Sequence, residues 1–172
     1  MMFYAAAAVA VIATVLVITR SNAVHALLYL VVSFLAAAVM FFTLGAPLAA
    51  ALEVIIYAGA VVVLFVFVVM MANLQAPKSR TSAWTSLRVW AGPAALSLIL
   101  LGEFLVVIAA RAKRGLAPGA VPPKAVGVSL FGTYVLGVEL AAMLLLAAVV
   151  GAFHLGSRPE ASHHRFFGEA PR

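Results

Sequence analysis

The sequence predicts an all-α integral membrane protein with five transmembrane helices. Of the 172 residues, 66% are hydrophobic and only 9% are charged, whereas about 25% of residues are charged in soluble domains. The apolar runs are also long enough to span a bilayer, which takes about 20 residues per helix. A membrane β-barrel would need short segments of alternating polarity, and the chain has none.

The first two spans are expected at residues 3–19 and 25–44. The polar sequence Arg20-Ser21-Asn22 separates them. The first run lacks the basic start and the small-residue cleavage site of a signal peptide, so we expect it to be retained as a membrane helix. The sequence Gly45-Ala46-Pro47 ends the second span, because proline cannot continue a helix interior.

Three further spans are expected at residues 48–72, 89–110 and 129–153. A polar connection at 73–88 and a loop rich in glycine and proline at 111–128 separate them. Residues 1–155 therefore form a transmembrane domain, and residues 156–172 form a polar tail.

The orientation follows from the excess of Lys and Arg in cytoplasmic loops. One side of the membrane carries seven such residues and the other carries four. The seven are Arg20, Lys78, Arg80, Arg88, Arg158, Arg165 and Arg172, and the four are Arg111, Lys113, Arg114 and Lys124. This difference predicts a periplasmic N-terminus and a cytoplasmic C-terminus with a cytoplasmic tail.

The third span is the candidate functional element. It carries Glu53 about five residues after its start, Tyr57 one helical turn later, and then Ala58-Gly59-Ala60, which has almost no side-chain bulk. Glycine costs about 1 kcal/mol relative to alanine in a helix interior. Either Gly59 allows close contact with another helix, or it permits a π-bulge, which often marks function. The residues alone favour the first explanation.

Three glutamates fall at membrane depth: Glu53, Glu103 and Glu139. A carboxylate there costs about 2.5–3.5 kcal/mol on insertion scales and is a functional candidate by default. Each side chain could exchange protons, or could hydrogen-bond this chain to a partner helix. The fifth-span prediction places Glu139 near the middle of the bilayer.

Other chemistry is excluded or disfavoured. The chain has no cysteine, so it offers no thiolate ligands. His154, His163 and His164 have no paired acidic ligand, which disfavours a metal site. No phosphate-binding or dinucleotide-binding motif is present. The basic residues are dispersed between apolar runs rather than gathered in one patch, so no nucleic-acid partner is expected.

Three blocks of sequence resemble a known family. They are residues 21–30, residues 51–74, which contain Glu53, Tyr57 and Gly59, and residues 124–146, which contain Glu139. They resemble the subunit J family of the bacterial proton-pumping NADH:quinone oxidoreductase, respiratory complex I. Glu103 has no counterpart in the family pattern, and no family role is carried onto it.

The resemblance implies a multi-pass subunit of the bacterial inner membrane, in obligate association with other membrane-arm subunits, especially subunits K, A and H. It implies a π-bulge at Tyr57-Ala58-Gly59-Ala60 that acts as a hinge, and a proton route near Glu53, Tyr57, Gly59 and Glu139. FMN, iron–sulfur clusters, NADH and quinone would be bound by other subunits, and this chain would hold no cofactor.

The predicted function is therefore that of a non-catalytic subunit that couples quinone reduction to proton export through a gating third helix. The alternative is a homologous membrane subunit of a multisubunit cation/proton antiporter or of a membrane-bound hydrogenase. A purely structural scaffold is a third possibility.

Overall fold

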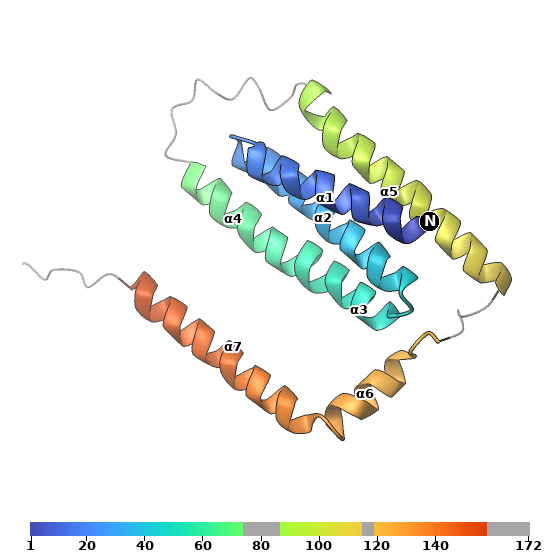
Figure 1. Ribbon diagram of the computed structural model, residues 1–172. Helices are drawn as coiled ribbons and strands as arrows, with labels where there is room; N and C mark the ends of the chain where they lie inside the picture. The colour runs from blue at the N-terminus through green and yellow to red at the C-terminus, as the bar shows by residue number, and fades with distance from the viewer. Residues whose placement is uncertain (74–86, 115–118, 158–172) are drawn as a thin grey trace, which may run out of the picture. The chain divides into compact units, whose positions relative to one another are not determined.

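The computed structural model describes residues 1–73, 87–114 and 119–157, and all regular structure in these ranges is helical (Figure 1). Five of its stretches are long and apolar enough to cross a membrane. The predicted all-helical fold with five long apolar helices is confirmed. The helices are α1 (Met2–Thr19), α2 (Ala23–Thr43), α3 (Pro47–Leu52), the π-helix η1 (Glu53–Val61), α4 (Val62–Asn73), α5 (Leu87–Arg114), α6 (Pro123–Phe131) and α7 (Val135–Gly156).

The chain divides into two compact units, Met1–Ala125 and Val126–Arg172. In the first unit, α1 and α2 pack against each other, and α5 contacts both of them. Alanine and valine dominate the contact, which lets the helix backbones approach closely in a membrane, where packing rather than water exclusion stabilises helix pairs. The core residues are Ala6, Val9, Ala13, Val32, Ala36, Val39 and Leu100.

Local signals fix the two helix connections at the start of the chain. The Asn22 side chain accepts a hydrogen bond of 3.0 Å from the Val24 amide and so caps α2. At the other end of α2, Gly45 adopts a left-handed φ of 85°. The amides of Gly45 and Ala46 then donate to the carbonyls of Phe42 and Phe41, as in a Schellman motif. Pro47 follows as the first residue of α3.

A glycine sets the contact between α2 and α5. Tyr29 is buried, and a Cβ atom added to Gly92 would collide with the Tyr29 hydroxyl. The Arg20 guanidinium lies 5.4 Å from the centre of the Tyr29 ring, within cation–π range. Gly92 therefore makes room for the Tyr29 hydroxyl, while Arg20 at the end of α1 lies over the Tyr29 ring.

The fifth span differs from the expected single helix at 129–153. The chain instead forms α6 and α7, with a break at residues 132–134. The Tyr134 amide donates to the carbonyl of Ser129, five residues back, at 3.0 Å, which widens the turn. A Cβ atom at Gly132 would lie 2.7 Å from the Val128 carbonyl oxygen, so this turn accepts glycine and resists larger residues.

Several sequence predictions fall outside the described residues. They concern most of the connection at 73–88 and most of the tail at 156–172. The residues concerned are Lys78, Arg80, Arg158, His163, His164, Arg165 and Arg172.

Candidate functional site

The third span contains a π-helix of nine residues, Glu53–Val61, between the α-helical segments α3 and α4. The Val62 amide, just beyond it, bonds to the carbonyls of Gly59 and Tyr57. The bond to Tyr57 reaches five residues back, which is the hydrogen-bond pattern of a π-helix. Such a segment is wider than an α-helix and accommodates an extra residue, and it is often found at functional positions.

Gly59 lies inside this wide turn. A Cβ atom there would lie 3.3 Å from the carbonyl oxygen of Val54, five residues earlier, and no other atom of the described residues within 4 Å meets it. The close-packing explanation for Gly59 therefore has no neighbouring helix in the described part of the chain. The glycine instead leaves space for a carbonyl of its own helix.

The Tyr57 side chain contacts α2 through the ring of Phe34. Its ring lies 5.5 Å from that of Phe34, at an interplanar angle of 56°. Tyr57 remains 48% exposed, whereas the next two residues, Ala58 and Gly59, are half-buried. The sequence analysis does not single out Phe34, because one phenylalanine in an apolar helix cannot be distinguished from another before the helix rotation is known.

Glu53 begins the π-helix, and its side chain is half-buried. Within the described ranges it has no hydrogen bond or ion pair. Its carboxyl group is therefore available to a partner subunit, to water or to a proton.

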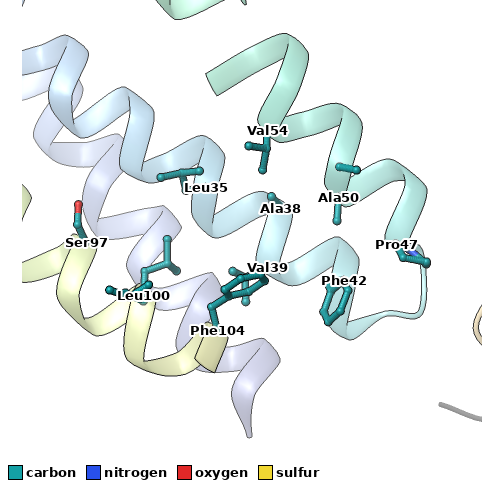
Figure 2. Close-up of a pocket in the computed structure, with 12 residues that line it drawn as sticks. Leu35, Ala38, Val39, Phe42, Pro47, Ala50, Val54, Ser97, Leu100 and Phe104 are labelled. Atoms are coloured by element: carbon teal, nitrogen blue, oxygen red, sulfur yellow. The ribbon is translucent and has the colours of Figure 1, made fainter. Parts of the chain in front are cut away.

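An apolar cavity of about 590 Å³ lies beside the start of the π-helix. Figure 2 shows side chains of α2, α5 and the third span pointing into it. Ser97 provides the one hydroxyl group among the lining residues. The lining consists of Leu35, Ala38, Val39, Phe42, Pro47, Ala50, Ala51, Val54, Ser97, Leu100, Leu101 and Phe104.

Glu103 directly precedes Phe104, one of the residues that line this cavity. Both of its carboxyl oxygens are buried and lack a hydrogen-bond partner among the described residues. The neighbouring Phe104 ring lies 6.1 Å from that of Phe42. The sequence showed Glu103 as a charge in an apolar run, but its enclosure depends on how α5 is rotated.

Glu139 belongs to the second unit and is the fifth residue of α7. It is exposed within that unit. At 1.5 Å per residue it lies about 6 Å from the start of α7, whereas a single span at 129–153 places it ten residues from the start of the span. The break at residues 132–134 causes the difference, because it moves the start of the long helix toward Glu139.

No group of three or more His, Cys, Asp or Glu side chains is arranged to hold a metal ion within the described ranges. His154 lies in the last turn of α7.

Comparison with known proteins identifies the family. A family model described as NADH-ubiquinone/plastoquinone oxidoreductase chain 6 matches residues 13–155. The chain belongs to this family. The match contains the whole π-helix, the cavity and all three membrane glutamates.

Relatives from several bacteria are similar to this chain over nearly their whole length. NADH-quinone oxidoreductase subunit J of Pseudomonas aeruginosa is 58% identical over 90% of this chain and 94% of that relative. Subunit J of Escherichia coli K12 is 51% identical over 92% of this chain and 87% of that relative. Subunit J of Buchnera aphidicola from Acyrthosiphon pisum is 46% identical over 90% of this chain and 92% of that relative. The predicted resemblance to the subunit J family is confirmed.

Proposed function

We propose that this chain is a membrane-arm subunit of a proton-translocating NADH:quinone oxidoreductase that couples quinone reduction to proton export and holds no redox centre itself. The observation that carries the coupling role is the π-helix at Glu53–Val61 in an otherwise α-helical span. NADH, FMN, iron–sulfur clusters and quinone would be bound by other subunits. The relatives compared are named for this oxidoreductase, which favours it over an antiporter or a hydrogenase.

The moving part is the third span. Conversion of η1 to an α-helix would remove its extra residue and rotate α4 by about 100° relative to α3. Such a one-residue change is a two-state switch of the kind that couples distant events in proteins. Gly59 is the hinge, with Tyr57, Ala58 and Ala60 beside it, because the contact between position 59 and the Val54 carbonyl exists only in the wide turn.

Glu53, Tyr57 and Glu139 are the candidate residues of the proton route. The Glu53 carboxyl has no partner in the described part of the chain, so it is free to take a proton or to order water when the helix changes form. Tyr57 would change its position relative to Phe34 in the same step. Glu139 would contribute a second carboxyl from α7.

The chain would lie in the bacterial inner membrane with its N-terminus in the periplasm and its C-terminal tail in the cytoplasm, as the loop charges favour. Its neighbours would be other membrane-arm subunits, especially K, A and H. Large apolar side chains along α4 and α7 are exposed in the described chain and fit contact with lipid and partner helices.

Substitution of Gly59 tests the gating role. Gly59→Ala should favour the α-helical form, because alanine gains about 1 kcal/mol of helix propensity and its Cβ would crowd the Val54 carbonyl at 3.3 Å. Gly59→Val should have a larger effect. We expect lower NADH-driven proton pumping and quinone reduction in membranes that contain equal amounts of assembled complex.

Gly102→Ala is the matched control, because a Cβ at Gly102 in α5 meets nothing within 4 Å. It changes helix propensity by the same amount outside the π-helix. Unchanged pumping in both Gly59 variants, with the complex fully assembled, would rule out the hinge.

A further inference from the structure

The apolar cavity beside the π-helix follows three helices over similar lengths. Its lining residues fall within residues 35–42 of α2, 47–54 of the third span and 97–104 of α5. At 1.5 Å per residue, each of these stretches is about 10 Å long. Pro47 is also the first residue of a stretch that can span a membrane. The cavity therefore begins near the membrane surface and lies within one leaflet, because half of the hydrocarbon core measures about 15 Å.

The lining of the cavity suits hydrocarbon rather than water. Apart from the Ser97 hydroxyl, the lining side chains are apolar, whereas a buried water needs several polar partners. The volume of about 590 Å³ falls within the range of about 300–1,000 Å³ that is usual for small-molecule sites. Figure 2 shows α2 between the third span and α5, with side chains of all three around the same space. A hydrocarbon chain there would supply the dispersion contacts that an empty space lacks.

Two contacts bring other parts of the chain to the end of the cavity that lies near the membrane surface. The rings of Phe42 and Phe104 lie 6.1 Å apart, which brings α5 to the C-terminal end of α2. The Val121 amide donates a hydrogen bond of 3.0 Å to the carbonyl of Gly45, two residues before Pro47. The chain that follows α5 therefore returns to the connection between α2 and α3.

This returning segment is basic. Residues 104–138 contain four cations and no acidic residue. Arg111 follows Phe104 by about 10 Å along α5, and the exposed Lys124 follows Val121 by three residues. Lys and Arg near a membrane surface attract anionic lipids and bind phosphate groups. The four cations are Arg111, Lys113, Arg114 and Lys124.

We propose that the cavity binds one acyl chain of an anionic phospholipid, whose phosphate lies against the basic segment at residues 111–124. An apolar cavity within one leaflet, with cations beyond its outer end, matches the two chemical parts of such a lipid. A helix of a partner subunit would account for the apolar lining but not for the cations. The inference goes beyond the proposed function and does not depend on gating, because it uses only the cavity and its surroundings.

The test is photolabelling of the purified complex in vesicles that contain phosphatidylglycerol with a diazirine in one acyl chain. Mass spectrometry of peptides from this subunit should place the label on the lining stretches. The double variant Ala51→Leu/Leu101→Phe narrows the cavity from two sides. Both residues line it and are exposed, so larger side chains there do not collide with α2. We expect roughly a tenfold fall in labelling, which corresponds to a loss of about 1.4 kcal/mol.

The matched control is Ala95→Leu/Leu98→Phe, which makes the same two changes at exposed positions of α5 that do not line the cavity. Ala51→Leu alone provides a milder second variant if the double variant assembles poorly. All labelling is compared at equal amounts of assembled complex.

The head group is tested with phosphatidylcholine that carries the same diazirine chain. We expect several-fold more label from phosphatidylglycerol in the wild type, because four cations favour an anionic lipid. The triple variant Arg111→Gln/Lys113→Gln/Lys124→Gln should remove this preference. Arg88→Gln, at the opposite end of α5, should retain it.

Electron cryomicroscopy of the wild-type complex from the same membranes should show the density of one hydrocarbon chain in the cavity. Label absent from the lining stretches, equal labelling in the narrowed and control variants, or a partner helix or a quinone in the cavity would overturn the proposal. Equal labelling by the two lipids would refute the anionic head group. Proton pumping does not enter these measurements, so a failure of the gating role would leave the lipid site standing.

Discussion

Glu103 has two buried carboxyl oxygens without a hydrogen-bond partner in the described part of the chain. Leaving a buried polar group unsatisfied costs about 1–3 kcal/mol, whereas replacing it by an apolar group can be neutral or stabilising. We therefore predict that Glu103→Leu keeps or raises the thermal stability of the assembled complex, as measured by native gel electrophoresis after heating. Normal pumping is expected, and a loss of pumping in fully assembled Glu103→Leu complex would show that this carboxyl takes part in proton transfer.

Tyr29 and Gly92 form a pair that can be tested by rescue. Gly92→Ala should destabilise the α2–α5 contact by about 1–3 kcal/mol, the usual cost of overpacking, because its Cβ would meet the Tyr29 hydroxyl. Adding Tyr29→Phe removes that hydroxyl and leaves a ring carbon 3.2 Å away. The double variant should therefore recover part of the lost stability, measured by thermal inactivation. If Tyr29→Phe does not rescue the complex, the collision is not the cause.

At this scale the sequence singles out Glu53, Tyr57 and Gly59 as candidates, because each stands out in an apolar run, and all three lie in the π-helix. It did not identify Phe34, or the enclosure of the Glu103 oxygens. Both depend on which way a helix is rotated. A span that is apolar on every side carries no periodic signal from which that rotation can be read.

At the scale of the helices, the first four spans begin and end close to their predicted positions, because local signals mark their ends. Asn22 caps one helix, and Gly45 and Pro47 separate the next two. The break between α6 and α7 was missed, because it contains one glycine and no proline. The π-helix is predicted by the family resemblance, whereas the residues alone favour close packing around Gly59, because glycine in a membrane helix serves both purposes.

The break between α6 and α7 gives a prediction of its own. Gly132→Ala should reduce the amount of assembled complex, because its Cβ would lie 2.7 Å from the Val128 carbonyl oxygen and the turn would have to open. Gly127→Ala in α6 is the control, since nothing lies within 4 Å of a Cβ there. Quantitative immunoblots of membrane fractions measure the effect, and equal amounts of complex in both variants would contradict it.

For the whole molecule, the main feature is how much apolar surface the described chain leaves uncovered. Leu136, Leu140 and Met143 of α7 are all more than half exposed, and Glu139 lies among them in sequence. A carboxylate facing lipid is costly, so we expect Glu139 to contact protein rather than lipid in the assembled complex.

Glu139→Gln tests whether that contact serves more than assembly. Glutamine keeps the shape and the hydrogen-bonding capacity of the side chain but cannot ionise. We predict normal assembly with reduced pumping, measured per assembled complex in membrane vesicles, and Glu103→Gln serves as the matched carboxyl control. Full pumping in the Glu139→Gln complex would show that Glu139 serves only the contact between helices in the assembled complex.

The π-helix also has a consequence along the membrane normal. The extra residue in the wide turn adds little length to the third span. If the π-helix became an α-helix, this residue would lengthen the span by about 1.5 Å, and the rotation of α4 would be coupled to its translation along the helix axis. A partner subunit in contact with the exposed Met70 and Met71 near the C-terminal end of α4 would therefore be displaced both around and along the helix axis by one rearrangement near Gly59.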